Sequence, residues 1–488
     1  MKSRTWVFGI FVVLLATLAL PGPLAAQHRR YELIDLGTLG GPNSLVNGTP
    51  PPMINNRGVV AGEADTATPC SYLGGFVSPA IRWENGVLTD LGLLPGGCFS
   101  LPNSINAKGM VVGAGDIGVL DPETGAPVLR ADLRYKGQVI SLGTFGGTNS
   151  LANEVNNRGQ VVGGAENTEP DPWNFGGILE LPSSPTAWHG FVWDKGVMQD
   201  LGTLGGPDSF GLLINDSGQI AGLSFTNSIP SLAFGFPTID PFLWERGRMI
   251  DLGTLGGTLG IAGGLNNRGQ VVGFSDIEGD VASHAFIWER GVLSDIGTLG
   301  GDNSNATWIN DAGHVLGISD LPDGTHHAFI WRNGTMTDLG TVDGDPCSNG
   351  FHINARGQAI GTSTDCQGTI LHFFLWEDGS MVDLRAQVLP GSGFAFIEPV
   401  AINDVGEIVG DGILPNGDVH AVVLRPDGPC DAACQAITTA GPNRAAAASG
   451  SLGNSNTSRR ERKPSSPLER VRAQMRQGYR MPGLRKPN

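Results

Sequence analysis

Five histidines recur at equivalent positions of a repeated pattern, and regularly spaced imidazoles suggest metal binding or proton transfer. They are His189, His284, His327, His372 and His420. A metal or acid–base site needs side chains that converge, whereas equivalent positions of a ring-shaped repeat protein are spread around the ring. Because buried polar groups mostly serve structural hydrogen bonds, we predict that each histidine bonds within its own repeat, to the aspartate of an Asp-Leu-Gly sequence.

Two acidic segments offer a second candidate chemistry, because carboxylates on short turns are ligands that calcium prefers. They are residues 276–280 (DIEGD) and residues 320–324 (DLPDG). Neither has the ligand set of an EF-hand loop, so we predict solvated turn acids, with calcium binding as the alternative. The sequence also lacks Gly-x-Ser-x-Gly, His-Glu-x-x-His and zinc-type Cys/His clusters. We therefore assign no catalytic residue, no metal ligand and no cofactor.

The stretch DLGTLGG at residues 251–257 has glycines spaced as in a phosphate-binding loop. It lacks the lysine of a P-loop, and it returns unchanged at residues 35–41 and 200–206. A motif present in nearly every repeat is expected to build the fold rather than to do chemistry. We therefore interpret DLGTLGG as the connector between successive sheets.

Eight units, beginning near residues 35, 90, 141, 200, 251, 295, 338 and 383, supply the elements that would position these residues. Each unit contains an aliphatic residue, an Asn, and a Gly three residues after the Asn. This pattern predicts a turn between two strands, because Asn bonds its own backbone and Gly takes a positive φ. The eight Asn are Asn55, Asn106, Asn156, Asn215, Asn266, Asn310, Asn354 and Asn403.

A second glycine follows four residues after the first, inside the next strand, as at Gly222 and Gly273. Glycine within a strand marks close approach by a neighbour. We predict that this neighbour is an aromatic residue of the third strand. Seven units have one there and the eighth has Leu424; the seven are Trp83, Tyr135, Trp193, Trp244, Trp288, Trp331 and Trp376.

Four strands in a repeat of this length are typical of a β-propeller. The eighth unit stops after its third strand, at residues 420–425, while an unassigned strand at residues 31–37 precedes the first unit. We predict an all-β propeller of eight four-stranded blades over residues 27–428, closed by this N-terminal strand. The alternatives are an open solenoid and a seven-bladed ring with one irregular unit.

The third strands read SHAFIW at residues 283–288 and HHAFIW at residues 326–331, with variants WHGFVW and LHFFLW. With the Asn-x-x-Gly and DLGTLGG elements, the chain resembles the HAF-repeat family of bacterial extracellular proteins over roughly residues 31–428. The first, second and fourth units depart from this strand pattern. The resemblance implies secretion and repeats, but no established activity.

The two chain ends differ from the body. Residues 1–26 combine Lys2 and Arg4 with an apolar segment and a cleavage site after Ala26, which predicts a signal peptide. We expect a secreted protein, extracellular or periplasmic, with no membrane span in the mature chain because no other stretch reaches about 20 apolar residues. Residues 429–488 predict a basic, mostly disordered and flexible tail.

The net charge of −16 hides an acidic body and a basic tail. Residues 27–428 carry 18 Lys and Arg against 44 Asp and Glu, and the tail carries 11 against 3. An acidic body argues against nucleic acid as a partner, because phosphate binding requires a basic face.

Six cysteines in an exported chain predict three disulfides. In a propeller, the loop between the second and third strands shares a face with the connector to the next blade. We therefore predict the pairs Cys70–Cys98 and Cys347–Cys366, together with the local pair Cys430–Cys434.

The loops between the second and third strands are long in the first four units, at residues 64–78, 115–128, 165–187 and 224–239. Long loops in a compact repeat are usually functional or disordered, and disordered loops are poor in aromatics. We predict a ligand-binding rim on the connector face, with Trp173 as its anchor. The alternative is that the aromatics pin their own loops onto the ring. The predicted rim residues are Trp173, Phe175, Phe225, Phe234 and Phe236.

These features favour an exported, monomeric, non-enzymatic propeller that binds a protein or glycan through the long loops of blades one to four. A secreted carbohydrate-active hydrolase or lyase with a site at the channel mouth is the first alternative. A structural envelope or matrix component is the second. A carboxylate pair or His cluster at the channel mouth would favour the enzyme.

Overall fold

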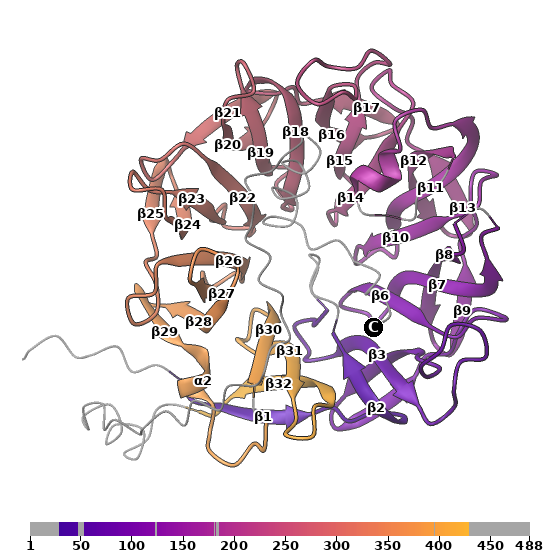
Figure 1. Ribbon diagram of the computed structural model, residues 1–488, viewed down its shortest axis with the longest axis vertical. Helices are drawn as coiled ribbons and strands as arrows, with labels where there is room; N and C mark the ends of the chain where they lie inside the picture. The colour runs from indigo at the N-terminus through magenta and orange to yellow at the C-terminus, as the bar shows by residue number, and fades with distance from the viewer. Residues whose placement is uncertain are drawn as a thin grey trace, which may run out of the picture.

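The computed structural model describes residues 29–46, 53–122, 124–179, 181, 185–394 and 396–428. Within these residues the protein is a β-propeller: small antiparallel sheets follow one another around a central axis (Figure 1). The expected signal peptide, the expected tail, Cys430 and Cys434 lie outside the described residues.

The sheets are built from strands that follow one another along the chain. In order, the strands are β1 (Tyr31–Asp35), β2 (Gly40–Leu45), β3 (Val60–Thr66), β4 (Ala80–Glu84), β5 (Val87–Asp90), β6 (Ser100–Ile105), β7 (Val111–Leu120), β8 (Pro127–Tyr135), β9 (Gln138–Ser141), β10 (Ser150–Val155), β11 (Val161–Pro170), β12 (Thr186–Asp194), β13 (Val197–Asp200), β14 (Ser209–Ile214), β15 (Ile220–Phe225), β16 (Ile239–Glu245), β17 (Arg248–Asp251), β18 (Gly256–Leu265), β19 (Val271–Ile277), β20 (Ser283–Glu289), β21 (Val292–Gly297), β22 (Ser304–Ile309), β23 (Val315–Asp320), β24 (His326–Arg332), β25 (Thr335–Asp338), β26 (Cys347–Ile353), β27 (Ala359–Thr364), β28 (Ile370–Glu377), β29 (Ser380–Asp383), β30 (Phe396–Ile402), β31 (Ile408–Ile413) and β32 (Val419–Pro426). Two four-residue helices interrupt them, α1 (Phe175–Ile178) and α2 (Leu384–Gln387).

We number the units by their strands: units 1 to 7 are β2–β5, β6–β9, β10–β13, β14–β17, β18–β21, β22–β25 and β26–β29, and unit 8 is β30–β32 with β1. Six units are separate four-stranded sheets, including unit 8 with the order β1-β32-β31-β30. Units 4 and 5 are joined into one eight-stranded sheet, because Ile239 of β16 pairs in parallel with Leu259 of β18.

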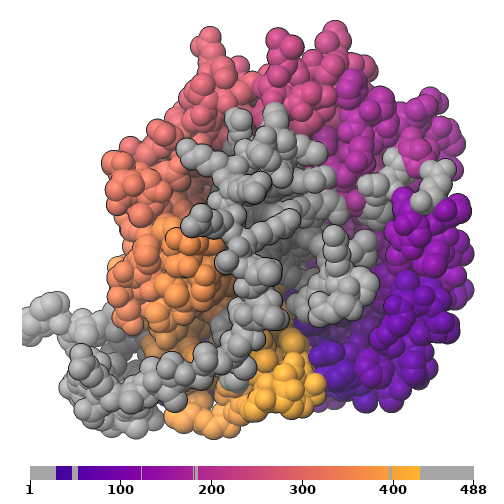
Figure 2. All heavy atoms as spheres, in the orientation of Figure 1, coloured from indigo at the N-terminus to yellow at the C-terminus, as the bar shows by residue number. Residues whose placement is uncertain are grey.

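The strand predicted ahead of the first unit does join the last one. β1 pairs antiparallel with β32, from Tyr31 opposite Pro426 to Asp35 opposite Val422. Figure 1 shows this indigo strand along the yellow end of the chain, and in Figure 2 the indigo and yellow parts of the surface lie side by side. Residues from the two ends of the body therefore form one sheet.

The Asn-x-x-Gly turns form as predicted, because their bonding is local. In unit 5, Asn266 Oδ1 accepts hydrogen bonds from the backbone N–H groups of Arg268 and Gln270, both at 3.1 Å. Gly269 closes the turn at a φ of 76°, which glycine adopts without strain. The apolar core lies between neighbouring sheets. Each turn therefore fixes how two strands of its unit pack against this core.

The prediction of the aromatic that covers the strand glycine was wrong by two residues. Gly222 lies opposite Phe242 and Gly317 opposite Phe329, not opposite the tryptophans. A Cβ at Gly317 would lie 2.6 Å from Phe329 Cζ, so the phenylalanine ring covers the bare backbone. The tryptophan stands two residues further along, on the same face of the strand, because side chains alternate with a period of two.

A second register error concerns the second unit. Tyr135 was predicted to be the equivalent of the tryptophans, but Val111 pairs with Arg134, as Val161 pairs with Trp193. Arg134 therefore occupies the tryptophan position in this unit.

Two of the predicted disulfides are confirmed, Cys70–Cys98 and Cys347–Cys366. Each joins a loop between second and third strands to a nearby connector, as the shared face of these segments required. The pair Cys430–Cys434 stays a prediction.

Replacing both Cys347 and Cys366 with serine is expected to lower the free energy of unfolding by about 3 kcal/mol, because their bridge closes a short loop in the unfolded chain. Urea unfolding under non-reducing conditions measures this loss. Wild-type protein with its disulfides reduced serves as the control and should lose at least as much. A loss below about 1 kcal/mol would contradict the expected contribution of this bridge.

Candidate functional site

Four of the five repeated histidines pair with the aspartate of an Asp-Leu-Gly sequence, or of its Asp-Ile-Gly variant at Asp295, as predicted. Each bond joins His Nδ1 to an Asp carboxylate on the neighbouring outer strand. The pairs are His189–Asp200 at 2.8 Å, His284–Asp295 at 2.7 Å, His327–Asp338 at 2.8 Å and His420–Asp35 at 2.9 Å. In the last pair, the aspartate comes from β1, so this bond also joins the two ends of the body.

The fifth histidine departs from this rule. His372 Nδ1 bonds Asp345 at 2.7 Å, whereas Asp383, the aspartate at the equivalent position, accepts the backbone N–H of Arg385 and caps α2. Burial of His189 opposes its charged form, but the hydrogen bond and the charge of Asp200 outweigh burial and raise its pKa. The histidines therefore act as separate ties around the ring, not as one convergent site.

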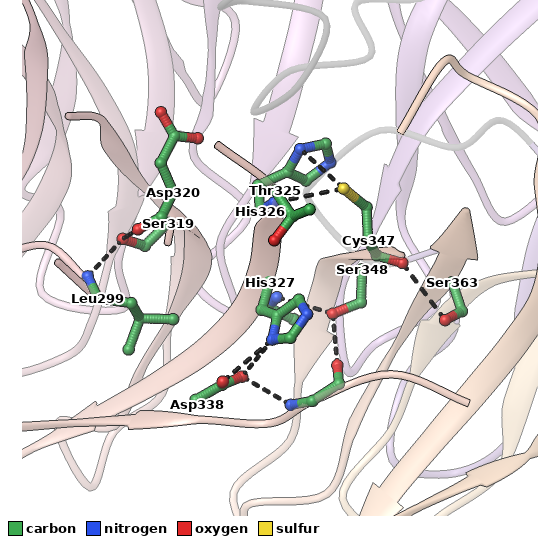
Figure 3. A network of polar contacts seen from close by, with 12 residues as sticks. Leu299, Ser319, Asp320, Thr325, His326, His327, Asp338, Cys347, Ser348 and Ser363 are labelled. Atoms are coloured by element: carbon green, nitrogen blue, oxygen red, sulfur yellow. Dashed lines mark hydrogen bonds and ion pairs between the residues drawn. The ribbon is translucent and has the colours of Figure 1, made fainter. Parts of the chain in front are cut away.

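A repeated serine, which the sequence analysis missed, links each of several units to the next. Ser348 Oγ accepts the N–H of Ala328 at 2.9 Å and donates to the carbonyl of Gly340 at 2.6 Å (Figure 3). Ser150, Ser209 and Ser304 make the same two bonds. The signal was present in the sequence, because a serine stands three residues after the last glycine of most DLGTLGG-type connectors.

The eight Asn of the turns form a closed cycle of hydrogen bonds around the axis. The Nδ2 group of each donates to the backbone carbonyl of the Asn in the next unit, at 2.9–3.1 Å, and Asn403 donates back to Asn55. The cycle borders a central cavity of about 440 Å³. The same side chains thus close their own turns and bind neighbouring units together.

Asn and Asp residues of the turns line this cavity together with aliphatic residues, and its wall also contains Glu154, Trp308 and His352. Burial raises the pKa of Glu154 to about 8, although its carboxyl accepts the N–H of Ile214 at 2.7 Å. Burial lowers the pKa of His352 to about 4, and its ring lies 4.5 Å from that of Trp308. Near neutral pH, Glu154 and His352 are therefore mainly uncharged.

The aromatic residues predicted to form an exposed rim lie largely in the core, so this placement is corrected. Phe175 and Phe225 are fully buried, and Phe234 and Phe236 nearly so. The rings of Phe175 and Phe225 meet edge to face at 5.1 Å. Trp173 is partly buried against the same cluster. Large apolar rings gain more from this mutual burial than from exposure to water, so they hold the loops of units 3 and 4 down.

The same long loops present other apolar side chains to solvent. These are Phe76, Val119, Leu120, Ile229 and Leu232, with exposed fractions from 41% for Phe76 to 108% for Leu232. These side chains lie on the connector face, because the ends of the second strands hydrogen-bond the connectors. In unit 3, for example, the N–H of the connector residue Gly147 donates to the carbonyl of Glu166.

The acidic segments bond their own surroundings. Asp280 accepts from the N–H and hydroxyl of Thr258, Asp320 accepts from Asn303, and Asp323 accepts from Thr325. Among the described residues, no group of three or more His, Cys, Asp or Glu is arranged to hold a metal ion. In the same part of the chain, no helix is long and apolar enough to cross a membrane.

No protein-family model matches the sequence, and no curated protein matches it. Among solved structures, the chain is similar to the β-propeller domain of the Trilobed protease from Pyrococcus furiosus, with 13% identity and a TM-score of 0.41, over 69% of this chain and 94% of that one. It is also similar to a puromycin-hydrolyzing peptidase of Mycobacterium tuberculosis, with 12% identity and a TM-score of 0.43, over 83% of this chain and 56% of that one. A Trypanosoma rangeli sialidase in complex with sialic acid shares 9% identity at a TM-score of 0.29, over 77% and 61% of the two chains.

Proposed function

We propose that this chain is an exported, eight-bladed, closed propeller of the HAF-repeat type, and that it binds a protein or glycan partner without catalysis. The cycle of eight Asn hydrogen bonds and the pairing of β1 with β32 support eight blades and closure. The two disulfides support export, because such bonds persist in oxidising compartments.

The binding surface is the set of exposed apolar side chains on the long loops of units 1, 2 and 4. This observation carries the proposal, since exposed apolar groups gathered on one face mark interaction sites. Leu232 stands fully in solvent at the tip of a loop that is pinned below by Phe234 and Phe236. The disulfide Cys70–Cys98 anchors the loop of Phe76 in a similar way. Loops that are already ordered lose less entropy on binding.

The test replaces Phe76, Leu120 and Leu232 together with serine in the mature chain. Retention on a panel of glycans and envelope polymers is expected to fall at least about tenfold, because the apolar anchors are lost. The matched control replaces three equally exposed valines of fourth strands with serine, namely Val87, Val197 and Val292. Melting temperatures of both variants should stay near that of the wild type.

Equal loss in the loop variant and the valine control, or retention unchanged in both, would overturn the proposed surface. The same panel is assayed for released products. Glu154 lines the cavity with a raised pKa, as a general acid requires. Product formation that Glu154→Gln abolishes would replace binding by a hydrolase or lyase function.

A further inference from the structure

Three side-chain ties normally hold the third strand of a unit, one to its own fourth strand and two across the seam to the connector and first strand of the next unit. The residue before the repeated His donates its N–H to an Asn or Asp of the connector, as Ser283 does to Asn303. The His bonds the connector aspartate, and the residue after the His donates its N–H to the connector serine, as Ala285 does to Ser304. These ties recur with small variations around the ring.

The third strand of unit 4 and the connector that follows it replace at least one residue of each tie, although Asp251 keeps the connector aspartate. Asp240 stands at the His position and Pro241 after it, while Leu259 and Gly260 replace the Asn and Ser of the connector. The changes to Pro241 and Gly260 match each other, because proline has no N–H that a serine at position 260 could accept. A Cβ at position 260 would also lie 2.8 Å from Pro241 Cδ. The backbones come close enough here for Ile239 to pair with Leu259.

Two carboxyl groups take the place of the His–Asp pair between the third and fourth strands of unit 4. Phe242 pairs with Asp251 in the same register as Phe191 pairs with Asp200, so Asp240 faces Asp251 as His189 faces Asp200. Asp240 is 8% exposed, and its side chain hydrogen-bonds that of Asp251. Its Oδ1 atom is buried without a partner. Two carboxyl groups at hydrogen-bond distance hold together only while they share a proton.

We propose that Asp240 and Asp251 share one proton and form a pH-sensitive joint between β16 and β17 of unit 4, beside the seam with unit 5, which loosens when that proton is lost. The proton takes the place of the imidazole that joins the corresponding strands in other units. Losing it leaves two negative charges side by side next to a seam that already lacks the serine and asparagine ties.

The surroundings offer no positive charge to replace the proton. Neither β15 nor β18, which flank β16, contains a titratable residue, and the loop at residues 226–238 has none either. On β17, Arg248 lies opposite Glu245 at the far end of the strand. Asp251 is thus the charged group that faces Asp240.

Burial, followed by the charge of Asp251, raises the pKa of Asp240 to about 7. The folded protein therefore holds this proton more tightly than the unfolded chain, where the pKa is 3.8. The free energy of unfolding must then fall as pH rises from about 4 to about 7, and it stays at the lower value above that range.

Hydrogen exchange of β16 and β17 at pH 6 and pH 8.5, corrected for intrinsic rates, tests the joint. In the wild type, the opening equilibrium of these strands is expected to rise at least about tenfold between the two pH values. In Asp240→Asn the opening equilibrium should not rise, because the side-chain amide of Asn donates a hydrogen bond to Asp251 at both pH values. His284→Asp should transfer the pH dependence to β20 and β21.

An equal rise in wild type and Asp240→Asn would overturn the joint. So would suppression of the wild-type rise by millimolar calcium, which would make the pair a cation site. Melting curves at pH 6 confirm that each variant is folded. The readout is the opening of strands and not the binding of a partner, so it does not depend on whether the proposed partner surface is correct.

Discussion

Deleting residues 27–37 is expected to destabilise the protein more than any single substitution, because the deletion removes the outer strand of unit 8. Tyr31 is fully buried and Leu36 is 5% exposed, and burial of such side chains contributes roughly 1.5–3 kcal/mol each. The deletion also removes Asp35 from His420 and leaves β32 as an open sheet edge. Thermal unfolding should show a much lower midpoint, and the open edge should promote association.

A rescue variant separates loss of the strand from mere truncation. β1 runs antiparallel to β32, with Tyr31 opposite Pro426, so residues 29–37 joined directly after Gly428 can return through a short hairpin. This variant should regain most of the lost midpoint, although its strand enters from the other end of the chain. An unchanged midpoint in the simple deletion would refute closure and would favour an open solenoid.

The repeat made the strand order predictable, because the motifs that mark each turn act over a few residues. Asn266 and Gly269 close their turn with bonds inside one segment, so a single copy of the motif suffices to identify it. The cycle of Asn side chains could not be predicted, because each Nδ2 reaches a carbonyl 44 to 59 residues away, or 348 for Asn403. That contact depends on the rotation between units, which no local pattern encodes.

The register errors have a similarly physical cause. Phe242 and Trp244 lie on the same face of β16, and both recur in the repeat. Periodicity alone therefore cannot tell which of them covers Gly222. The sequence shows that an aromatic must lie over the glycine, while the pairing of the strands decides which one does.

The loop aromatics show where local reasoning ended. Phe175 belongs to the loop of unit 3 and Phe225 to the end of the second strand of unit 4, yet their rings are in contact. Composition established that these loops are ordered. Whether their rings face inward or outward depends on contacts between units. Those contacts turn the rings inward, in agreement with the alternative that the aromatics pin their own loops onto the ring. Partly buried Trp173 has no tested role in binding.

The other large effect is expected at the second unit, where a buried ion pair occupies positions that units 3 to 7 fill with Phe and Trp. Asp132 and Arg134 have side chains fully excluded from solvent. Arg134 Nη2 lies 2.8 Å from Asp132 Oδ2 and donates to Ser100 Oγ at 2.7 Å. Asp132→Ala is expected to lower the free energy of unfolding by about 3–5 kcal/mol, because it leaves the guanidinium buried without its counter-charge. Urea unfolding measures the loss.

The repeat itself supplies the control for this prediction. The double variant Asp132→Phe, Arg134→Trp installs the residues that Phe191 and Trp193 provide in unit 3 at the same register. Removing both charges avoids the unpaired ion, and apolar replacement of a buried pair is neutral or stabilising by up to about 4 kcal/mol. The double variant should therefore unfold at a urea concentration equal to or above that of the wild type. If it proves as unstable as Asp132→Ala, the loss arises from packing around β8, and the ion pair cannot be its cause.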